Sequence, residues 1–293
     1  AVWPSVYPAD TVLDIFTYAG APGAYNLNLG SGAGLWWQKD GFSISANYVA
    51  ANGNSGRPGF DSTINPATIT PENPDGDPFG CSQSGGIGTS CSAQTGTFQV
   101  AYTKPNWGLA VAYVYSSGGP GLYGGNGTPL ANEIQSLSSS VNSIGISGYW
   151  QPSTSGIVPS ISYGWGLNGY TADRASAGSI ANRNIVDGAQ SQSWYVGLQW
   201  SDVFIKGNAA GMAVGQATFL TSSGNTNAAT GLSPNDGNYA WEWWYKFQVT
   251  DNISVTPAIF YLSAPLGQEI RTAGFNDATL SNFGGLVKTT FKF

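Results

Sequence analysis

The sequence predicts an all-β protein, an antiparallel up-and-down β-barrel whose tilted strands cross a membrane. Three observations lead to this prediction. The 293 residues include 41 Gly, 11 Trp, 15 Tyr and 13 Phe, and this composition disfavours helices and favours strands. Apolar and polar residues alternate with period two in segments of roughly ten residues, the length with which a tilted strand crosses a bilayer. The connections between these segments are alternately short and long.

Charged residues are scarce, and their balance excludes several classes of protein. Only 9% of the residues are charged and the formal net charge is -6, which argues against a nucleic-acid partner because such proteins carry a basic surface. The chain contains no His, the commonest general base and metal ligand. We therefore expect no enzyme, no cofactor and no bound metal. The longest apolar stretch, residues 107–115, is far shorter than the about 20 residues of a membrane helix.

The chain divides into a short leading segment and a barrel domain. We expect residues 1–30 to be a loop or linker that enters the barrel, and residues 31–293 to form the barrel itself. The alternation is clearest in residues 239–250, where the odd positions are aromatic or apolar and the even positions include Glu242 and Lys246. The eleven predicted strands are residues 31–38, 42–50, 96–103, 107–116, 141–150, 157–166, 191–200, 203–214, 238–249, 253–263 and 282–293.

The predicted strands are joined by five short turns and five long loops in strict alternation. The long loops are rich in Gly, Ser, Asn and Pro and show no helical periodicity. A meander with short turns at one end and long loops at the other is typical of transmembrane barrels. Loops of this length are usually functional or disordered, so we expect them outside the membrane and partly folded inward. The long loops are residues 51–95, 117–140, 167–190, 215–237 and 264–281.

The orientation of the two faces follows from the residue types that they carry. Trp and Tyr are frequent on the apolar faces close to strand ends, as in the aromatic girdles at membrane interfaces. The opposite faces carry small and polar residues that leave room for water. Because a Lys or Arg at the bilayer midplane costs about 2–4 kcal/mol, the low charge also suits a lipid-facing surface. We expect the apolar faces to contact lipid and the polar faces to surround a water-filled lumen.

Eleven strands cannot close an antiparallel barrel, because the first and the last run in the same direction and would meet parallel. We expect an odd number of further strands N-terminal to this chain, and five would give sixteen. The alternative is that residues 11–18 form a twelfth strand.

Two cysteines, Cys81 and Cys91, lie in a Gly- and Ser-rich loop. We expect a disulfide that closes this loop, which indicates an oxidising compartment. A pair of free thiols is the alternative.

Five charged residues are candidates for the lining of the lumen. They are Lys206, Glu242, Lys246, Lys288 and Lys292, all placed on the polar faces of predicted strands. Four positive charges and one negative charge predict a mild preference for anions. The alternative for each lysine is a solvated or snorkelling side chain at the rim.

The last segment, residues 282–293, places Phe291 and Phe293 on one face and ends the chain in an aromatic residue. It resembles the terminal strand that the outer-membrane assembly machinery recognises. Together with residues 32–50 and 248–260, it resembles the cyanobacterial outer-membrane porins of the carbohydrate-selective, OprB-like family, often called iron-uptake porins. The resemblance implies a sixteen-stranded homotrimeric channel in the outer membrane of a Gram-negative-type cell. It also implies an N-terminal S-layer-homology domain that binds peptidoglycan-linked polymer, and this sequence contains no such domain.

The expected function is passive diffusion of small hydrophilic solutes and inorganic ions through an outer-membrane porin. Whether the channel is general or selective for sugars or iron is left open by the residues. The alternative is a non-conducting surface adhesin or receptor whose long loops bind a ligand.

Overall fold

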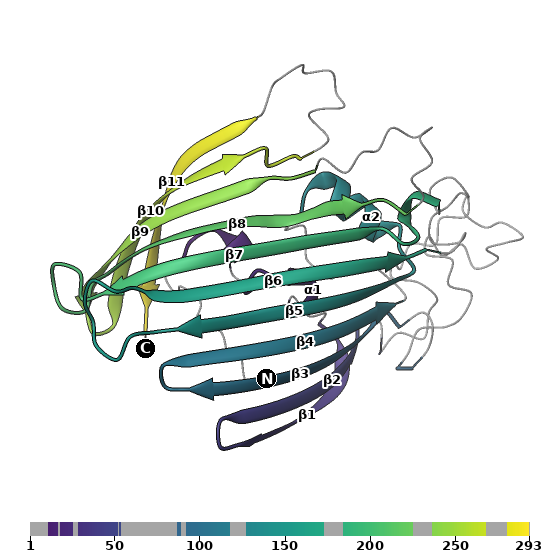
Figure 1. The fold of residues 1–293 in the computed structure, drawn as a ribbon, viewed down its shortest axis with the longest axis horizontal. Helices are drawn as coiled ribbons and strands as arrows, with labels where there is room; N and C mark the ends of the chain where they lie inside the picture. The colour runs from purple at the N-terminus through teal and green to yellow at the C-terminus, as the bar shows by residue number, and fades with distance from the viewer. Residues whose placement is uncertain are drawn as a thin grey trace, which may run out of the picture.

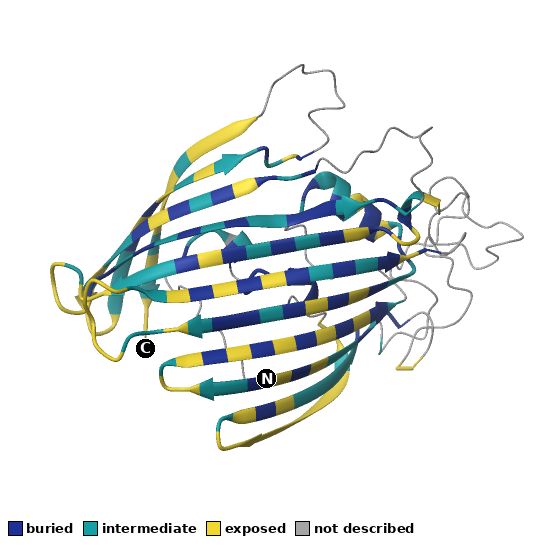
Figure 2. Cartoon of the chain, viewed as in Figure 1, coloured by how far each residue is buried: buried dark blue, intermediate teal, exposed yellow. Residues whose placement is uncertain are grey.

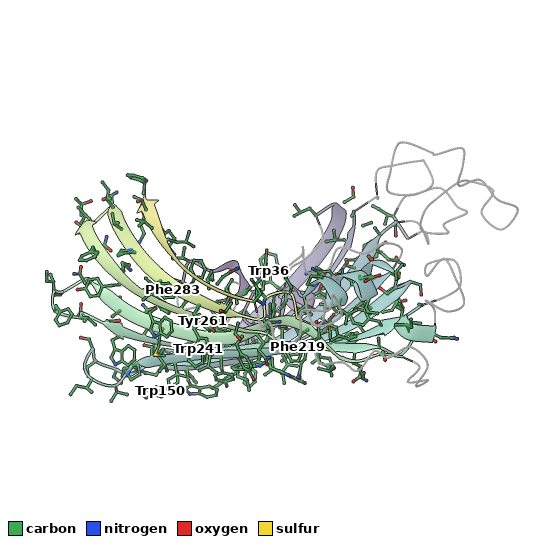
Figure 3. The ribbon with its side chains drawn as sticks, turned by 90° about the horizontal axis from the view of Figure 1, so that it is seen from above. Trp36, Trp150, Phe219, Trp241, Tyr261 and Phe283 are labelled. Carbon is green, nitrogen blue, oxygen red and sulfur yellow. The ribbon has the colours of Figure 1, made fainter. Side chains whose placement is uncertain are left out.

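The computed structural model describes residues 11–16, 18–25, 29–51, 53, 87–88, 92–117, 127–172, 184–224, 236–267 and 280–292. In these residues eleven strands form a single antiparallel sheet in the order of the sequence (Figure 1). The up-and-down architecture predicted from the sequence is therefore confirmed. The sheet is strongly curved into a trough, and its long axis follows the strands (Figures 1 and 3).

All eleven predicted strands are present, and the boundaries of nine agree with the prediction within two residues. The strand predicted at residues 157–166 is observed at Ser160–Thr171, and the one predicted at residues 203–214 at Ala209–Ser222. The strands are β1 (Ser31–Lys39), β2 (Phe42–Ala50), β3 (Gln94–Lys104), β4 (Trp107–Ser117), β5 (Ser140–Trp150), β6 (Ser160–Thr171), β7 (Gln190–Ser201), β8 (Ala209–Ser222), β9 (Tyr239–Thr250), β10 (Ile253–Ser263) and β11 (Ser281–Phe291). In the described residues β1 pairs with β2 alone and β11 with β10 alone.

The tight turn between β1 and β2 follows from its sequence. Asp40 and Gly41 both have positive φ, 52° and 90°. This backbone conformation is that of a two-residue hairpin turn, for which Asp-Gly is a preferred sequence. The turn sets the register of the pair, in which Lys39 lies opposite Phe42.

The strand β8 begins at Ala209 rather than at residue 203, so this predicted boundary is wrong. Residues 202–208 form a longer turn in which Asp202 and Phe204 have positive φ, 58° and 61°. The Asp202 carboxylate accepts a hydrogen bond from the Gly207 N–H at 2.8 Å, which closes the turn locally. A bent backbone with an internal hydrogen bond cannot take part in the ladder with β7.

The two faces of the sheet differ in the way that the alternation predicts. Along β4 every second side chain is exposed and every second one is buried (Figure 2). The exposed set is Trp107, Leu109, Val111, Tyr113 and Tyr115. Trp150 and Trp241 lie on the convex side of the trough (Figure 3). The large apolar side chains therefore cover the outside of the sheet.

Part of the concave face is covered by a segment that precedes the first strand. It contains a 3-10 helix, η1 (Asp14–Phe16), and a short helix, α1 (Pro22–Tyr25). Both lie inside the trough, behind the sheet in Figure 1. The helical conformation of η1 shows that the alternative of a twelfth strand at residues 11–18 is wrong. This segment and the inner wall form one apolar cluster: Phe16, Ala19, Ala21, Ala24, Tyr25, Ala112, Val114, Tyr195, Ala213, Ala240, Trp244 and Ala258.

A second apolar cluster lies at the long-loop end of the inner face. Its helix, α2 (Pro129–Ser136), belongs to the loop between β4 and β5, where the sequence showed no helical periodicity. Thr128 caps the helix, because its hydroxyl oxygen accepts a hydrogen bond from the Ala131 N–H at 3.2 Å. Ile134 of α2 packs among the inward side chains of β5 and β6, including Val141 and Tyr170. Of the helices in the described part of the chain, none combines the length and the apolar character that spanning a membrane requires.

Candidate channel interior

The inner wall carries small polar side chains that hydrogen-bond to one another. Thr95 and Ser116 lie opposite each other on β3 and β4, and a hydrogen bond of 2.7 Å connects their hydroxyl oxygens. The Asn168 amide donates to the Ser191 hydroxyl at 3.0 Å, and the Tyr170 hydroxyl lies 2.7 Å from the same oxygen. Such groups are satisfied by each other or by water, and they suit the wall of an aqueous lumen.

Glu242 lies on the inner face of β9, but the structure places it beneath the N-terminal segment. Its side chain is 0% exposed. The two carboxylate oxygens accept hydrogen bonds from the backbone N–H groups of Val12 and Leu13, at 2.6 and 2.7 Å. Bonds from two donors to one carboxylate are charge-assisted and stronger than neutral ones. Glu242 therefore binds the segment rather than facing an open lumen.

Lys288 contacts the same segment from β11. Its ammonium group donates a hydrogen bond to the carbonyl oxygen of Thr11 at 2.9 Å. The side chain is half-buried on the inner face, and its charge attracts the Glu242 carboxylate. Two of the five residues that the sequence analysis placed on the lumen wall thus bind adjacent residues of the N-terminal segment.

The other three candidate lysines lie in different surroundings. Lys246 is half-buried on the inner face of β9, opposite Ala209 in the register with β8. Lys206 is exposed in the turn of residues 202–208, so its predicted position on the polar face of a strand is wrong, because β8 begins after it. Lys292 is exposed just beyond β11, where its backbone N–H donates to the Asn252 carbonyl at 2.9 Å.

The turn that carries Lys206 also holds a carboxylate with a perturbed pKa. The hydrogen bond from the Gly207 N–H lowers the pKa of Asp202 below its ordinary value, and the Ser155 hydroxyl and the positive charge of Lys206 act in the same direction. The turn is therefore tightest when Asp202 is ionised.

Of the four remaining candidate residues, the structure describes one. Phe291 is the last residue of β11 and is exposed. Phe293, Cys81 and Cys91 lie outside the described residues. Within the described ranges, His, Cys, Asp and Glu side chains nowhere gather in a group of three that could hold a metal ion.

The sequence analysis missed the position of the N-terminal segment, although the inner wall carries a signal of it. Gly145 and Gly166 are opposite each other on β5 and β6, and both point inward. A Cβ added at Gly166 would lie 2.8 Å from the Ala21 Cα, and one at Gly145 would lie 2.7 Å from the Ala24 Cβ. Neighbouring inward glycines on central strands mark a close approach of another backbone.

A meander of antiparallel strands with an apolar convex face and a polar concave face defines the class of transmembrane β-barrels. The comparison with protein families identifies the group within this class. The family model described as "Carbohydrate-selective porin, OprB family" matches residues 14–293. The chain belongs to this family, whose members are proteins of the Gram-negative outer membrane.

Two curated relatives come from cyanobacteria, and both are described as uncharacterized proteins. The one from Synechocystis sp. is 28% identical over 282 residues, which are 90% of this chain and 43% of the relative. The one from Nostoc sp. is 29% identical over 195 residues, 63% of this chain and 29% of the relative. The chain thus spans less than half the length of the curated relatives that it matches.

Similar solved structures are porins with low sequence identity. A porin refined at 1.8 Å is 9% identical, with 89% of this chain and 60% of that chain covered and a TM-score of 0.45. An anion-selective porin from Comamonas acidovorans is 10% identical, with coverages of 89% and 58% and a TM-score of 0.49. OprB from Pseudomonas putida is 15% identical, with coverages of 90% and 73% and a TM-score of 0.37.

Proposed function

We propose that this chain forms much of the wall of an outer-membrane channel for passive diffusion of small hydrophilic solutes and inorganic ions. The observation that carries the proposal is the inversion of the sheet. Large apolar side chains are exposed on the convex face, as in the five of β4, while the concave face carries Ser, Thr, Asn and Gln. A soluble barrel has the opposite arrangement, because its apolar side chains pack inside. Membership of the porin family supports the same reading.

The edges of the sheet require further pairing for such a channel. In hydrocarbon an unpaired strand N–H or C=O costs several kcal/mol, so a sheet in lipid closes on itself. In the described residues β1 and β11 each have one neighbour and run in the same direction. We propose that an odd number of strands outside the described residues joins these edges, and five would complete a sixteen-stranded barrel.

The charges on the inner wall favour anions in this proposal. Lys246 lies on the inner face, whereas Lys288 and Glu242 both bind the N-terminal segment and their opposite charges compensate each other. The lumen would then carry an excess of positive charge on this side. Lys206 and Lys292 are exposed at the ends of strands and would act only at the rim.

Reconstitution of the purified full-length protein into planar bilayers tests the function. Discrete conductance steps with a reversal potential that favours anions are expected, and liposome swelling in sugars of increasing size would report the largest solute that passes. Well-folded protein that inserts and stays silent would overturn the proposal and favour an adhesin or receptor. Trimeric assembly, binding of peptidoglycan through a further domain and recognition of Phe291 and Phe293 by the assembly machinery stay predictions; native mass measurement in detergent tests the first.

A further inference from the structure

We propose that residues 11–16 and 18–25 form a resident strap inside the channel, and that this strap sets the upper size of the solutes that pass. The inference rests on the proposed function, because it concerns the lumen of that channel. The strap comprises η1, α1 and the residues around them, and it lies within the trough formed by the sheet (Figures 1 and 3).

The strap follows the inner wall across the strands rather than along them. At its start Thr11 and Val12 are bound by Lys288 of β11 and Glu242 of β9. Further along, the Gly20 carbonyl accepts a hydrogen bond at 2.8 Å from the Ser193 hydroxyl of β7. Its end is held on β5, where the hydroxyl oxygens of Tyr25 and Ser147 are 3.1 Å apart. The strap therefore crosses from β11 to β5, and four polar anchors fix it in order.

Between these anchors the wall is shaped to receive the strap. Gly164 of β6 leaves no room for a side chain, because an added Cβ would collide with the Ala19 carbonyl group. Gly166, two residues further, is in the same position against Ala21. The ring of Tyr195 packs beside Phe16 with ring centroids 6.3 Å apart. The inward residues of β4, β8, β9 and β10 in the shared apolar cluster are alanines, with Val114 and Trp244 as the larger members.

A wall of this kind is unusual for an aqueous channel, whose inward positions normally meet water. Phe16, Ala19 and Ala21 are 0% exposed, so the contact between strap and wall excludes water. Apolar burial together with anchors on four strands indicates a fixed constituent of the lumen rather than a passing segment. Val12, Leu13 and Ile15 are partly buried and pack against the same cluster. The strap narrows the channel from the side of β5–β11, and solute would pass between it and the rest of the wall.

The position of the strap can be tested without any transport measurement. Tyr25→Cys combined with Ser147→Cys, in a background with Cys81→Ala and Cys91→Ala, places one thiol on each side of the contact in which the native hydroxyl oxygens are 3.1 Å apart. We expect a short bifunctional thiol reagent to join these two cysteines, detected by mass spectrometry of a digest. The control pair, Tyr25→Cys with Gly169→Cys, should not be joined, because Gly169 lies on the outer face of β6 and a Cβ there meets nothing within 4 Å. Failure of the first pair to cross-link in the folded protein overturns the position of the strap.

The effect on solute size is tested by displacing the strap. Gly164→Val places a side chain where the Ala19 carbonyl group lies, and Gly169→Val is the control on the same strand. A third variant replaces residues 12–25 by a Gly-Ser linker of the same length, and it keeps the wall intact. Since even a single helix is about 10 Å across, we expect the linker variant and Gly164→Val to raise single-channel conductance about twofold or more and to admit larger sugars in liposome swelling.

The outcomes separate this inference from the proposed function. If the linker variant migrates on gels with the heat-modifiable pattern of the wild type and also conducts like the wild type, the strap does not set the size of the solutes that pass. If no folded variant conducts, the proposed function and the role of the strap in size selection are both overturned. The location of the strap is then judged from the cross-linking result alone.

Discussion

Replacing Val100 by lysine is expected to destabilise the folded protein in lipid, because Val100 lies on the outer face near the middle of β3. Its side chain is 39% exposed in the isolated chain, and in a bilayer that exposed part would contact hydrocarbon. A lysine facing lipid at the bilayer midplane costs about 2–4 kcal/mol. Since about 1.4 kcal/mol corresponds to a factor of ten, the ratio of folded to unfolded protein should fall about 30- to 700-fold.

The matched control is Ser45→Lys, on the inner face of the neighbouring strand β2, where the adjacent Ile44 lies opposite Val100 in the register. The two lysines lie at nearly the same depth, but Ser45 is only half-buried, so the stem of the second lysine can carry its ammonium group into luminal water. We expect this variant to lose less than about half of the free energy that Val100→Lys loses. Urea unfolding in phospholipid vesicles, followed by Trp fluorescence and by gel migration without boiling, gives the free energies of unfolding. A stable Val100→Lys protein beside an unstable Ser45→Lys protein would refute the assignment of the convex face to lipid.

Three further predictions concern charge, pH and capping. Lys246→Gln should shift the reversal potential in a salt gradient toward cations, and by more than Lys206→Gln does; equal shifts would contradict a luminal role for Lys246. The Gly207 N–H lowers the pKa of Asp202 in the folded protein. The ionised Asp202 carboxylate therefore stabilises the fold above the ordinary Asp pKa, and this stabilisation is lost as the pH falls through the lowered value. The difference in urea midpoint between wild type and Asp202→Ala should vanish in acid. Thr128→Ala removes the cap of α2 and also the hydroxyl that donates to the buried Asp236 carboxylate, so it should cost more than the about 1 kcal/mol of a cap alone, measured by urea unfolding, with faster proteolysis in this loop.

The strands were predictable because lipid and water impose opposite demands on alternate residues. Along β4 this demand holds from Trp107 to Tyr115 without exception, so the period-two pattern located the strand within one residue at its end. The start of β8 was missed because Val203 and Ile205 continue the apolar alternation although the Asp202 turn bends their backbone. Pattern alone does not distinguish an apolar residue in a turn from one in a ladder.

The luminal residues were found only in part, because sequence shows the face of a side chain and not what lies against it. The alternation placed Glu242 and Lys288 correctly on the inner face, but their hydrogen bonds to Val12 and Thr11 join parts of the chain that no local pattern connects. For the same reason Trp244 had no explanation on a polar face, whereas in the structure it belongs to the apolar cluster beneath the segment that precedes β1.

The distance along the chain between Val12 and Glu242, 230 residues, has a consequence for the order of folding. Contacts between residues far apart in sequence form slowly, because the entropy of closing a large loop is lost before the contact contributes any favourable free energy. The seat for residues 11–25 is built from β4 to β11, so these strands must pair before the earliest part of the described chain has a place to bind. The first described residues to be synthesised are therefore among the last to reach their native contacts, and during biogenesis they need protection from other partners until the wall is complete.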